Sequence, residues 1–142
     1  MEQRLSLVTL GVDDVGRSRR FYEQGLGWRA SGASTGEVVF FQLGGIALAL
    51  WGRQALAEDA GVPGLGSGPA AVALAHNVRT KREVDTLLAR ADAAGGRIQR
   101  PARETAWGGY VGYFADPDGH IWEVTWNPAF TLRDDGSVEL PP

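Results

Sequence analysis

Short apolar runs with a two-residue period alternate along the chain with segments of helical period. Residues 107–126 contain two such runs, joined by Asp116-Pro117-Asp118-Gly119. These four residues match a type I turn, because Asp accepts local backbone hydrogen bonds, Pro presets φ and Gly closes the turn. Alternation in the second run places Trp122, Val124 and Trp126 on one face and Ile121, Glu123 and Thr125 on the other. The first face is predicted to be a core face, and one carboxylate lies on the second.

The remaining elements follow from the same patterns. Strands are predicted at 5–12, from Trp28, at 37–43 and at 46–51, with a helix after Asp13 or Asp14 that Gly25 and Gly27 end. A further strand is predicted at 70–78. Thr80 and Glu83 then form a capping box for a second amphipathic helix, which Gly95-Gly96 ends, and Arg97 to Arg100 form a short strand. Residues 53–69 contain several helix breakers and are interpreted as a linker.

The order strand, helix, three strands occurs twice, which indicates an internal repeat. Gly45 precedes Ala49 by four residues, as Gly119 precedes Glu123, and both pairs open a last strand. The sequence therefore predicts two βαβββ modules, at 5–52 and 70–127. The linker 53–69 joins them, and a tail, 128–142, with little to bury follows.

Composition narrows the class of partner. The chain has 142 residues, a net charge of −3 and no cysteine. The charge gives no reason to expect nucleic acid or an anionic membrane as partner, and the lack of cysteine excludes disulfides and thiolate ligands. No apolar run approaches 18 residues and no signal-peptide pattern is visible, so we expect a soluble, cytoplasmic protein.

FYEQGLGW after the first helix and YFADPDGHIWEV near the end, in a tandem βαβββ chain, resemble the vicinal oxygen chelate superfamily. That superfamily includes glyoxalase I, extradiol dioxygenases, and the fosfomycin and bleomycin resistance proteins. The resemblance covers about residues 5 to 127 and is specific for the fold, not for an activity. It implies an α+β fold in which a curled mixed sheet surrounds one cavity, with helices outside and a homodimer as the assembly.

The resemblance also implies four metal-ligand positions, which fall on Leu7, Ala49, Ala73 and Glu123 of this chain. Three of these side chains have no donor atom, and one carboxylate does not make a divalent metal site. We therefore expect no metal cofactor, with a divalent metal as the alternative. His76 has the parity of the helix-facing residues and His120 adjoins the turn, so neither is expected to be a ligand.

A cavity lined by the inward faces would bind a small molecule. Parity assigns to it Leu7, Thr9, Ala49, Trp51, Ala73, Glu123 and Thr125, and the preceding strand could add Trp107, Tyr110 and Tyr113. For any one of these aromatic residues, ordinary core packing is an equally good interpretation.

Glu123 has three possible roles: a structural acid bonded to Tyr110 or Thr9, an anchor for a ligand, or a general base. The leading hypothesis is a metal-free protein that binds a small, partly apolar molecule. The alternative is a lyase, isomerase or dioxygenase of the same superfamily, with Glu123 as base or as one metal ligand. A third hypothesis is a partner protein that acts through its dimer surface.

Overall fold

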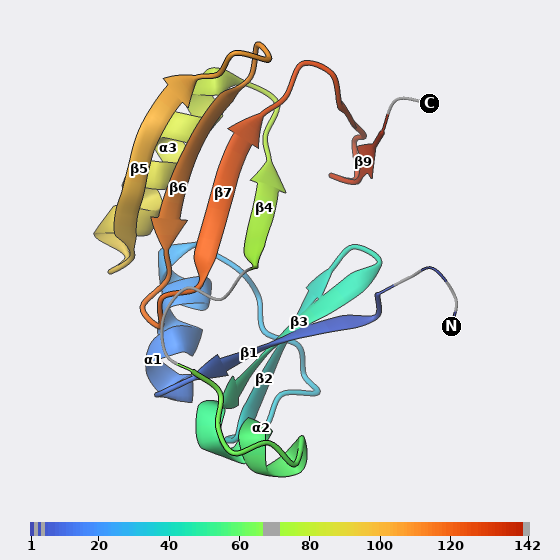
Figure 1. The fold of residues 1–142 in the computed structure, drawn as a ribbon, viewed down its shortest axis with the longest axis vertical. Coiled ribbons are helices and arrows are strands. Elements are labelled where there is room, and N and C mark those ends of the chain that lie inside the picture. Colours follow the sequence, from blue (N-terminus) through green and yellow to red (C-terminus); the bar gives the residue numbers. More distant parts are fainter. Residues whose placement is uncertain (2, 4, 67–71, 141–142) are drawn as a thin grey trace. The chain divides into compact units, whose positions relative to one another are not determined.

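The computed structural model describes residues 1, 3, 5–66 and 72–140, and the chain forms two compact units, Met1–Ser67 and Gly68–Pro142 (Figure 1). Each unit has its own sheet and its own helix packing, so the fold is mixed α+β, as predicted. Residues 67–69 of the expected linker and 70–71 of the expected strand lie outside the described residues, as do residues 141–142 of the tail.

The first unit is built on a three-stranded sheet in the order β1-β3-β2. Strand β1 (Leu7–Val12) runs parallel to β3 (Ile46–Gly52), and β2 (Val38–Leu43) is antiparallel to β3. Helix α1 (Val15–Arg20) begins after Asp14, whose carboxylate accepts a hydrogen bond from the Arg17 N–H at 2.8 Å. It continues directly as a π-helical turn, η1 (Phe21–Gly25). Of Asp13 and Asp14, the two residues predicted to cap this helix, Asp14 is the cap.

Apolar side chains from the sheet and from η1 form the core of this unit. Val12, Leu50 and Tyr22 are fully buried, and Phe41 and Leu48 are almost so. Tyr22 has its ring centroid 5.1 Å from that of Trp28 and 5.8 Å from that of Phe41. This aromatic cluster explains why FYEQGLGW follows the first helix, because its aromatic residues fill the space between helix and sheet.

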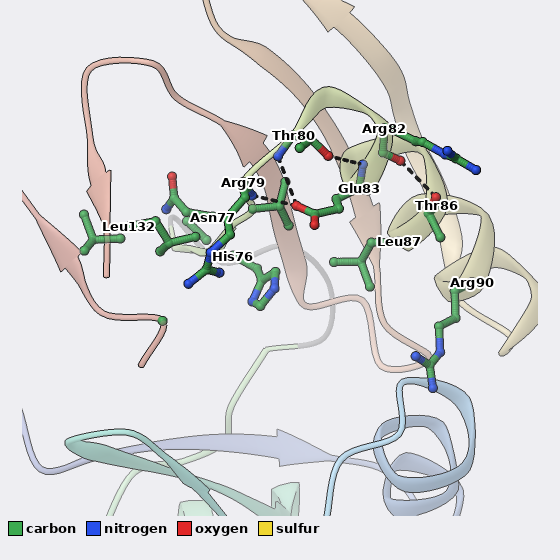
Figure 2. A pocket seen from close by; sticks show the side chains of 14 residues that line it. His76, Asn77, Arg79, Thr80, Arg82, Glu83, Thr86, Leu87, Arg90 and Leu132 are labelled. Carbon is green, nitrogen blue, oxygen red and sulfur yellow. Dashed lines mark hydrogen bonds between the residues drawn. The ribbon is translucent and has the colours of Figure 1, made fainter. Parts of the chain in front are cut away.

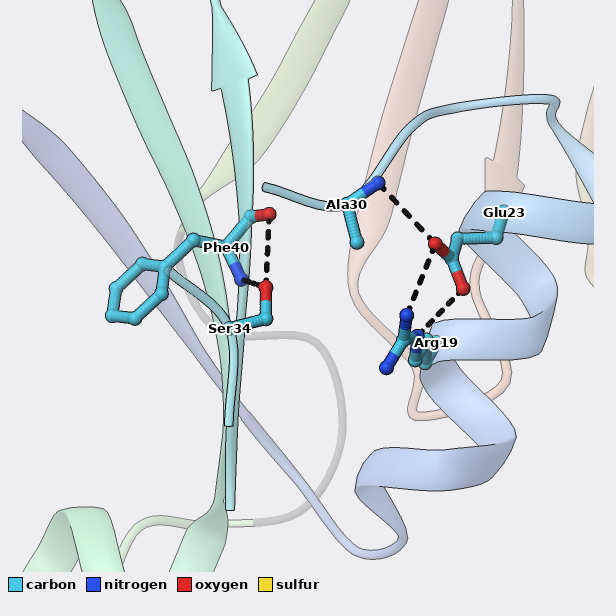
Figure 3. Close-up of polar contacts among 5 residues, drawn as sticks. All are labelled: Arg19, Glu23, Ala30, Ser34 and Phe40. Atoms are coloured by element: carbon cyan, nitrogen blue, oxygen red, sulfur yellow. Dashed lines mark hydrogen bonds and ion pairs between the residues drawn. The ribbon is translucent and has the colours of Figure 1, made fainter. Parts of the chain in front are cut away.

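The strand predicted from Trp28 does not form; a single bridge joins Ala30 to Phe41. Side chains take the hydrogen bonds that a strand would have made. Glu23 accepts from the Ala30 N–H at 3.3 Å, and Ser34 Oγ accepts from the Phe40 N–H at 2.9 Å (Figure 3). Short polar side chains compete with a ladder in this way, and the segment is rich in Ser, Thr and Gly.

The linker interpretation of residues 53–69 is wrong in its first half, which forms helix α2 (Arg53–Asp59). Gln, Ala, Leu and Glu favour helix, and Gln54 donates to Glu58 at 2.8 Å one turn later. Ala57 is the buried residue of this helix. The helix breakers begin only at Gly61, which has φ +68°. Composition averaged over the whole segment concealed this boundary.

The second unit contains a four-stranded sheet in the order β4-β7-β6-β5. Its strands are β4 (Ala73–Asn77), β5 (Arg97–Glu104), β6 (Tyr110–Ala115) and β7 (Ile121–Trp126). Helix α3 (Lys81–Ala93) packs on one face through β5, β6 and β7 (Figure 1). It begins with the predicted capping box: Thr80 accepts from the Glu83 N–H at 3.2 Å, and Glu83 accepts from the Thr80 N–H at 3.0 Å.

The predicted turn between β6 and β7 is confirmed. The Gly119 N–H donates to the Asp116 carbonyl at 3.0 Å, and Gly119 has φ +90°. One Asp116 carboxylate oxygen also accepts from the Asp118 and His120 N–H groups, each at 2.9 Å. These bonds fix the register of the hairpin, in which Trp122 and Val124 lie on the buried α3 face, as predicted.

Two segments contain more β-strand than the sequence predicted. Strand β5 extends to Glu104, beyond the predicted Arg100, and contains two register shifts against β6. The expected tail includes a small hairpin, β8 (Thr131–Leu132) with β9 (Val138–Glu139), and Arg79 Nη2 donates to the Arg133 carbonyl at 2.5 Å. None of the helices in the described part of the chain has both the length and the apolar composition needed to cross a membrane.

Candidate functional site

Four of the predicted site residues share one face of the first unit's sheet. Thr9 pairs with Ala49, Leu7 with Ala47 and Gly11 with Trp51, so these positions point to the side opposite the buried Leu48 and Leu50. Ala49 is only 1% exposed, whereas Leu7 is 43% exposed. The predicted parity of Leu7, Thr9, Ala49 and Trp51 is therefore confirmed. Whether they contact a ligand stays a prediction.

In the second unit the corresponding face lies opposite α3. Glu123 pairs with Ala75 on one side and Tyr113 on the other, while Thr125 pairs with Asn77 and Val111. Ala73, two residues before Ala75, has the same parity. The structure thus brings Ala73, Tyr113, Glu123 and Thr125 onto one face, here called the Glu123 face. Asn77 also lies on it and was not among the predicted residues.

Glu123 is hydrogen-bonded to Tyr113, whose hydroxyl donates to Glu123 Oε2 at 2.6 Å. This bond is the main cause that raises the pKa of Tyr113; desolvation and the Glu123 charge add to it, while Arg100 and Arg103 partly oppose it. Within the described residues, Glu123 Oε1 has no hydrogen bond. The partners predicted for Glu123 were Tyr110 or Thr9, so the tyrosine was misassigned. Counting outward from the four-residue turn would place Tyr113 opposite Trp122, but Asp116 pairs with His120, and this shift of one residue brings Tyr113 opposite Glu123.

Tyr110 points to the opposite side of the sheet, so its predicted place in the cavity is wrong. Its hydroxyl donates to Asp85 Oδ1 of α3 at 3.0 Å, and this bond raises the pKa of Tyr110. Lys81 Nζ lies 6.0 Å from the Tyr110 ring centroid and 5.1 Å from that of Trp126. The even-numbered residues of β6 face α3, and alternation separates Tyr110 from Tyr113.

Trp107 is not part of β6, which begins at Tyr110. It lies in the preceding loop, is 55% exposed, and its ring covers Gly109 so closely that a Cβ there would clash. Its predicted contribution from the strand is therefore wrong, because the WGG sequence forms a loop in which Gly108 has φ +90°.

Two polar atoms on the Glu123 face are buried without a partner. Thr125 is 4% exposed, and neither its Oγ1 nor Asn77 Oδ1 has a hydrogen bond. A buried polar group left unpaired costs about 1–3 kcal/mol. Such atoms are rare in native proteins, and two on paired residues mark a place where another polar group fits.

Arg100 and Arg103 also belong to this face, and the sequence analysis did not single them out. Arg100 pairs with Tyr113 and Arg103 with Val111. Pro101, which directly follows the predicted strand 97–100 and lies inside the observed β5, was the available signal, because proline in a sheet marks an edge strand or a bulge. Strand β5 is both: it lies at the sheet edge and it is bulged.

The four metal-ligand positions implied by the resemblance do not offer a donor set for a divalent ion. Leu7, Ala49 and Ala73 have no donor atoms, and no three His, Asp or Glu residues gather anywhere in the described chain. His120 Nδ1 is 2.8 Å from Asp116 Oδ2 and belongs to the turn. The residues present do not fit a metal at these positions, and the metal-free state stays a prediction.

A pocket of about 640 Å³ lies on the other side of the second unit, between α3, β4 and the β8–β9 hairpin (Figure 2). His76, Arg82 and Leu87 are among its lining residues. His76 therefore faces the helix side, as predicted. Partial burial lowers the pKa of His76, and the Glu83 charge opposes this. Ala75 and Asn77 of β4 line it as well, whereas Glu123 and Thr125 do not, so this pocket adjoins the Glu123 face along β4.

Comparison with known proteins assigns the chain to a family. The sequence profile of the Glyoxalase/Bleomycin resistance protein/Dioxygenase superfamily matches residues 4–124. The chain belongs to this superfamily. The match spans most of both units and confirms the resemblance stated from the FYEQGLGW and DPDGHIWEV motifs.

Solved structures of superfamily members agree. A glyoxalase-related enzyme from Fulvimarina pelagi is 45% identical, with a TM-score of 0.93, and the alignment covers 99% of this chain and 100% of that one. A glyoxalase/bleomycin resistance protein/dioxygenase from Nocardioides is 30% identical, with a TM-score of 0.75 and coverage of 90% and 86%. Lactoylglutathione lyase from Agrobacterium tumefaciens, at 23% identity and a TM-score of 0.67, with coverage of 89% and 95%, shares the fold. A search of curated proteins finds no significant match.

Proposed function

We propose that the protein binds a small, partly apolar molecule on the Glu123 face, without a metal, through hydrogen-bond donors on that molecule. The observation that carries this proposal is the set of unpaired polar atoms there. Thr125 Oγ1 and Asn77 Oδ1 are buried without partners, and Glu123 Oε1 has none within the described residues. Amide and carboxylate oxygens accept hydrogen bonds and the Thr hydroxyl can accept one, so a ligand with N–H or O–H groups satisfies this face.

The surroundings support an apolar body for the ligand. Ala73, Ala75 and Ile121 lie on the same face as Glu123 and offer no polar side-chain atoms. Ligand sites in proteins commonly combine such an apolar lining with a few placed polar groups. The Tyr113 hydrogen bond holds one carboxylate oxygen of Glu123, so the other can be presented to a ligand in a fixed orientation.

A second candidate is an enzyme that uses Glu123 as a general base. The 2.6 Å bond from Tyr113 favours it, because a positioned carboxylate with one unbonded oxygen can remove a proton from a bound substrate. The 45% identical protein from Fulvimarina pelagi is described as a glyoxalase-related enzyme, which supports the same candidate.

The test of binding is a thermal-shift and calorimetric screen of small aromatic compounds in matched pairs. Each pair differs only in an amine, amide or hydroxyl donor. The wild type is expected to bind members with donors, and Glu123→Gln and Thr125→Val to weaken that binding about 10-fold or more, as expected for a lost hydrogen bond to a charged or buried group. Glu37→Gln, an exposed position in the first unit, is the matched control.

Thr125→Val also separates loss of binding from loss of fold. Valine replaces an unpaired buried hydroxyl with a methyl of similar shape, so the free energy of unfolding is expected to rise by about 1 kcal/mol. A variant that is more stable and binds less well supports a ligand role for the hydroxyl. Equal binding by wild type, Glu123→Gln and Thr125→Val would refute the proposal.

Proton transfer is distinguished from binding alone by isotope exchange. Compounds that bind and carry a C–H group beside a carbonyl are incubated with the protein in D₂O, and deuterium uptake is followed by NMR. Exchange that the wild type accelerates and Glu123→Gln does not supports the enzyme. Binding with exchange no faster than in buffer supports the binding protein.

A further inference from the structure

We propose that the ligand of the Glu123 face carries an anionic oxyacid group, a carboxylate, phosphate or phosphonate, which Arg100 and Arg103 hold. This inference rests on the proposed function and specifies its ligand class. It starts from the irregular pairing of β5 with β6, which determines where these two side chains point.

Two one-residue shifts in register bring both arginines onto the Glu123 face. Arg97 pairs with Ala115, Arg100 with Tyr113 and Arg103 with Val111. Three residues of β5 therefore correspond to two residues of β6 at each step, as in a β-bulge. Residues opposite each other in an antiparallel pair point to the same side of the sheet. Because Tyr113 is hydrogen-bonded to Glu123, Arg100 and Arg103 point to the side of Glu123.

The charges of Arg100 and Arg103 act on Tyr113, and in the described part of the chain neither side chain forms an ion pair. Both lower the pKa of the Tyr113 hydroxyl through their charge, against the larger effect of Glu123, so both act on the same point of the face. Within the described residues neither has a hydrogen bond or ion pair from its side chain. Other arginines of this chain are paired, such as Arg19 with Glu23 and Arg133 with Glu139.

Unpaired arginines are unexpected here because acidic residues outnumber basic ones, 17 to 14. Two like charges on one face of a sheet repel each other, and a bound anion reduces that repulsion. The guanidinium group is planar and presents parallel N–H donors that match the two oxygens of a carboxylate or a phosphoryl group. The local chemistry therefore fits an oxyacid.

The sheet order sets the dimensions of the ligand. Arg100 and Arg103 lie on β5, and Glu123 and Thr125 on β7, with β6 between them. Neighbouring strands are about 4.8 Å apart, so the cationic and acceptor ends of the face are separated by about 10 Å. The ligand class is an elongated molecule with an oxyacid at one end, hydrogen-bond donors at the other, and an apolar body.

The experiment titrates the full chain with three probes of one length. They are 3-[4-(aminomethyl)phenyl]propanoate, its primary amide, and 2-[4-(aminomethyl)phenyl]ethylphosphonate. Binding is followed by NMR of ¹⁵N-labelled arginine side chains and by calorimetry. The carboxylate or the phosphonate is expected to bind about 10-fold or more tightly than the amide, and the preferred one of the two identifies the oxyacid. Raising the salt concentration is expected to reduce this advantage.

The variants are Arg100→Gln with Arg103→Gln, and the matched control Arg29→Gln with Arg82→Gln. All four positions are exposed, and Arg82 lies on α3, where it lines the pocket between α3 and β4. The first pair is expected to abolish the preference for the acid over the amide, and the control is expected to keep that preference. An equal loss in the control would overturn the proposal, because the anion would then bind elsewhere, and so would a failure of all three probes to bind.

Glu123→Gln separates the two proposals. If acid and amide bind equally and both need Glu123, the proposed function stands and the arginine proposal fails. If neither probe depends on Glu123, the proposed function fails and the arginine proposal fails with it.

Discussion

At the scale of single residues, the Glu123 face is organised around one short hydrogen bond. Tyr113 donates to Glu123 Oε2 at 2.6 Å, and Arg100 and Arg103 act on the same hydroxyl through their charge. The carboxylate holds the tyrosine proton, while the two arginines favour its loss. The pKa of Tyr113 is raised because the carboxylate has the larger effect, and this balance can be tested directly.

Glu123→Gln is expected to lower the pKa of Tyr113. The substitution removes the charge that holds the proton and leaves Arg100 and Arg103, which lower the pKa. The measurement is NMR titration with tyrosine labelled at the ring carbon bonded to oxygen. Asp85→Asn is the matched control, since it should lower the pKa of Tyr110 and leave Tyr113 unchanged.

The raised pKa of Tyr113 makes the free energy of unfolding depend on pH. Tyr113 is protonated more readily in the folded chain, so its contribution to stability is complete below the unfolded pKa of about 10 and is lost as pH rises through the raised folded value. An unchanged Tyr113 titration in Glu123→Gln would show that the hydrogen bond does not form in solution.

Alternation along a strand was sufficient to predict which residues share a face, but not to identify their partners. Glu123 and Thr125 were placed correctly on the face opposite the buried Trp122 and Val124. Tyr110 and Tyr113 were treated alike although they differ by three positions and therefore point to opposite sides. The unpaired atoms of Thr125 and Asn77 depend on the absence of neighbours, which no sequence pattern expresses.

At the scale of elements, motifs that span a few residues predicted the structure correctly, whereas composition averaged over a long segment did not. The capping box of α3 and the turn at residues 116–119 involve bonds between residues a few positions apart, so their sequences determine them. The strand expected from Trp28 was lost because serine, threonine and glutamate side chains satisfy its backbone. Helix α2 was missed because the glycines that follow it dominated the composition.

Gly112→Ala is expected to destabilise the second unit by about 1–3 kcal/mol, the usual cost of overpacking. Gly112 is buried where α3 crosses β6, and a Cβ there would lie 2.4 Å from Leu88 Cδ1 and 3.1 Å from the Ala102 backbone. Chemical denaturation measures the change. Gly36→Ala is the control, because nothing lies within 4 Å of a Cβ at Gly36.

A double-mutant cycle attributes the cost of Gly112→Ala to this contact. In a Leu88→Ala background the added methyl no longer meets the leucine, so Gly112→Ala should cost much less than in the wild type. Equal costs in both backgrounds would assign the effect to the Ala102 backbone instead.

At the scale of the whole molecule, membership of the superfamily defines the fold and leaves the chemistry open. The motifs that carry the resemblance lie in an aromatic cluster and in a turn. They are structural, which explains why they identified the superfamily and not an activity. The metal-ligand positions that the resemblance implied fall here on Leu7, Ala49, Ala73 and Glu123.

Purified protein is expected to contain less than stoichiometric divalent metal. Its unfolding temperature should not change with EDTA or with added zinc, nickel, manganese or iron(II), because a single carboxylate binds such ions weakly. Elemental analysis and thermal unfolding measure both. Stoichiometric metal in the wild type that disappears in Glu123→Gln would contradict the expectation.

The two bulges of β5 have a consequence for how such chains vary in length. Arg97, Arg100 and Arg103 recur every third residue, a period that neither a regular strand nor an α-helix repeats on one face. Deleting one residue between two of them would remove that bulge and leave the regular two-residue spacing of a strand, so both arginines would stay on the same side of the sheet. Among homologues, a gap of a single residue at either bulge would therefore straighten this edge strand and leave the positive charge on the same surface.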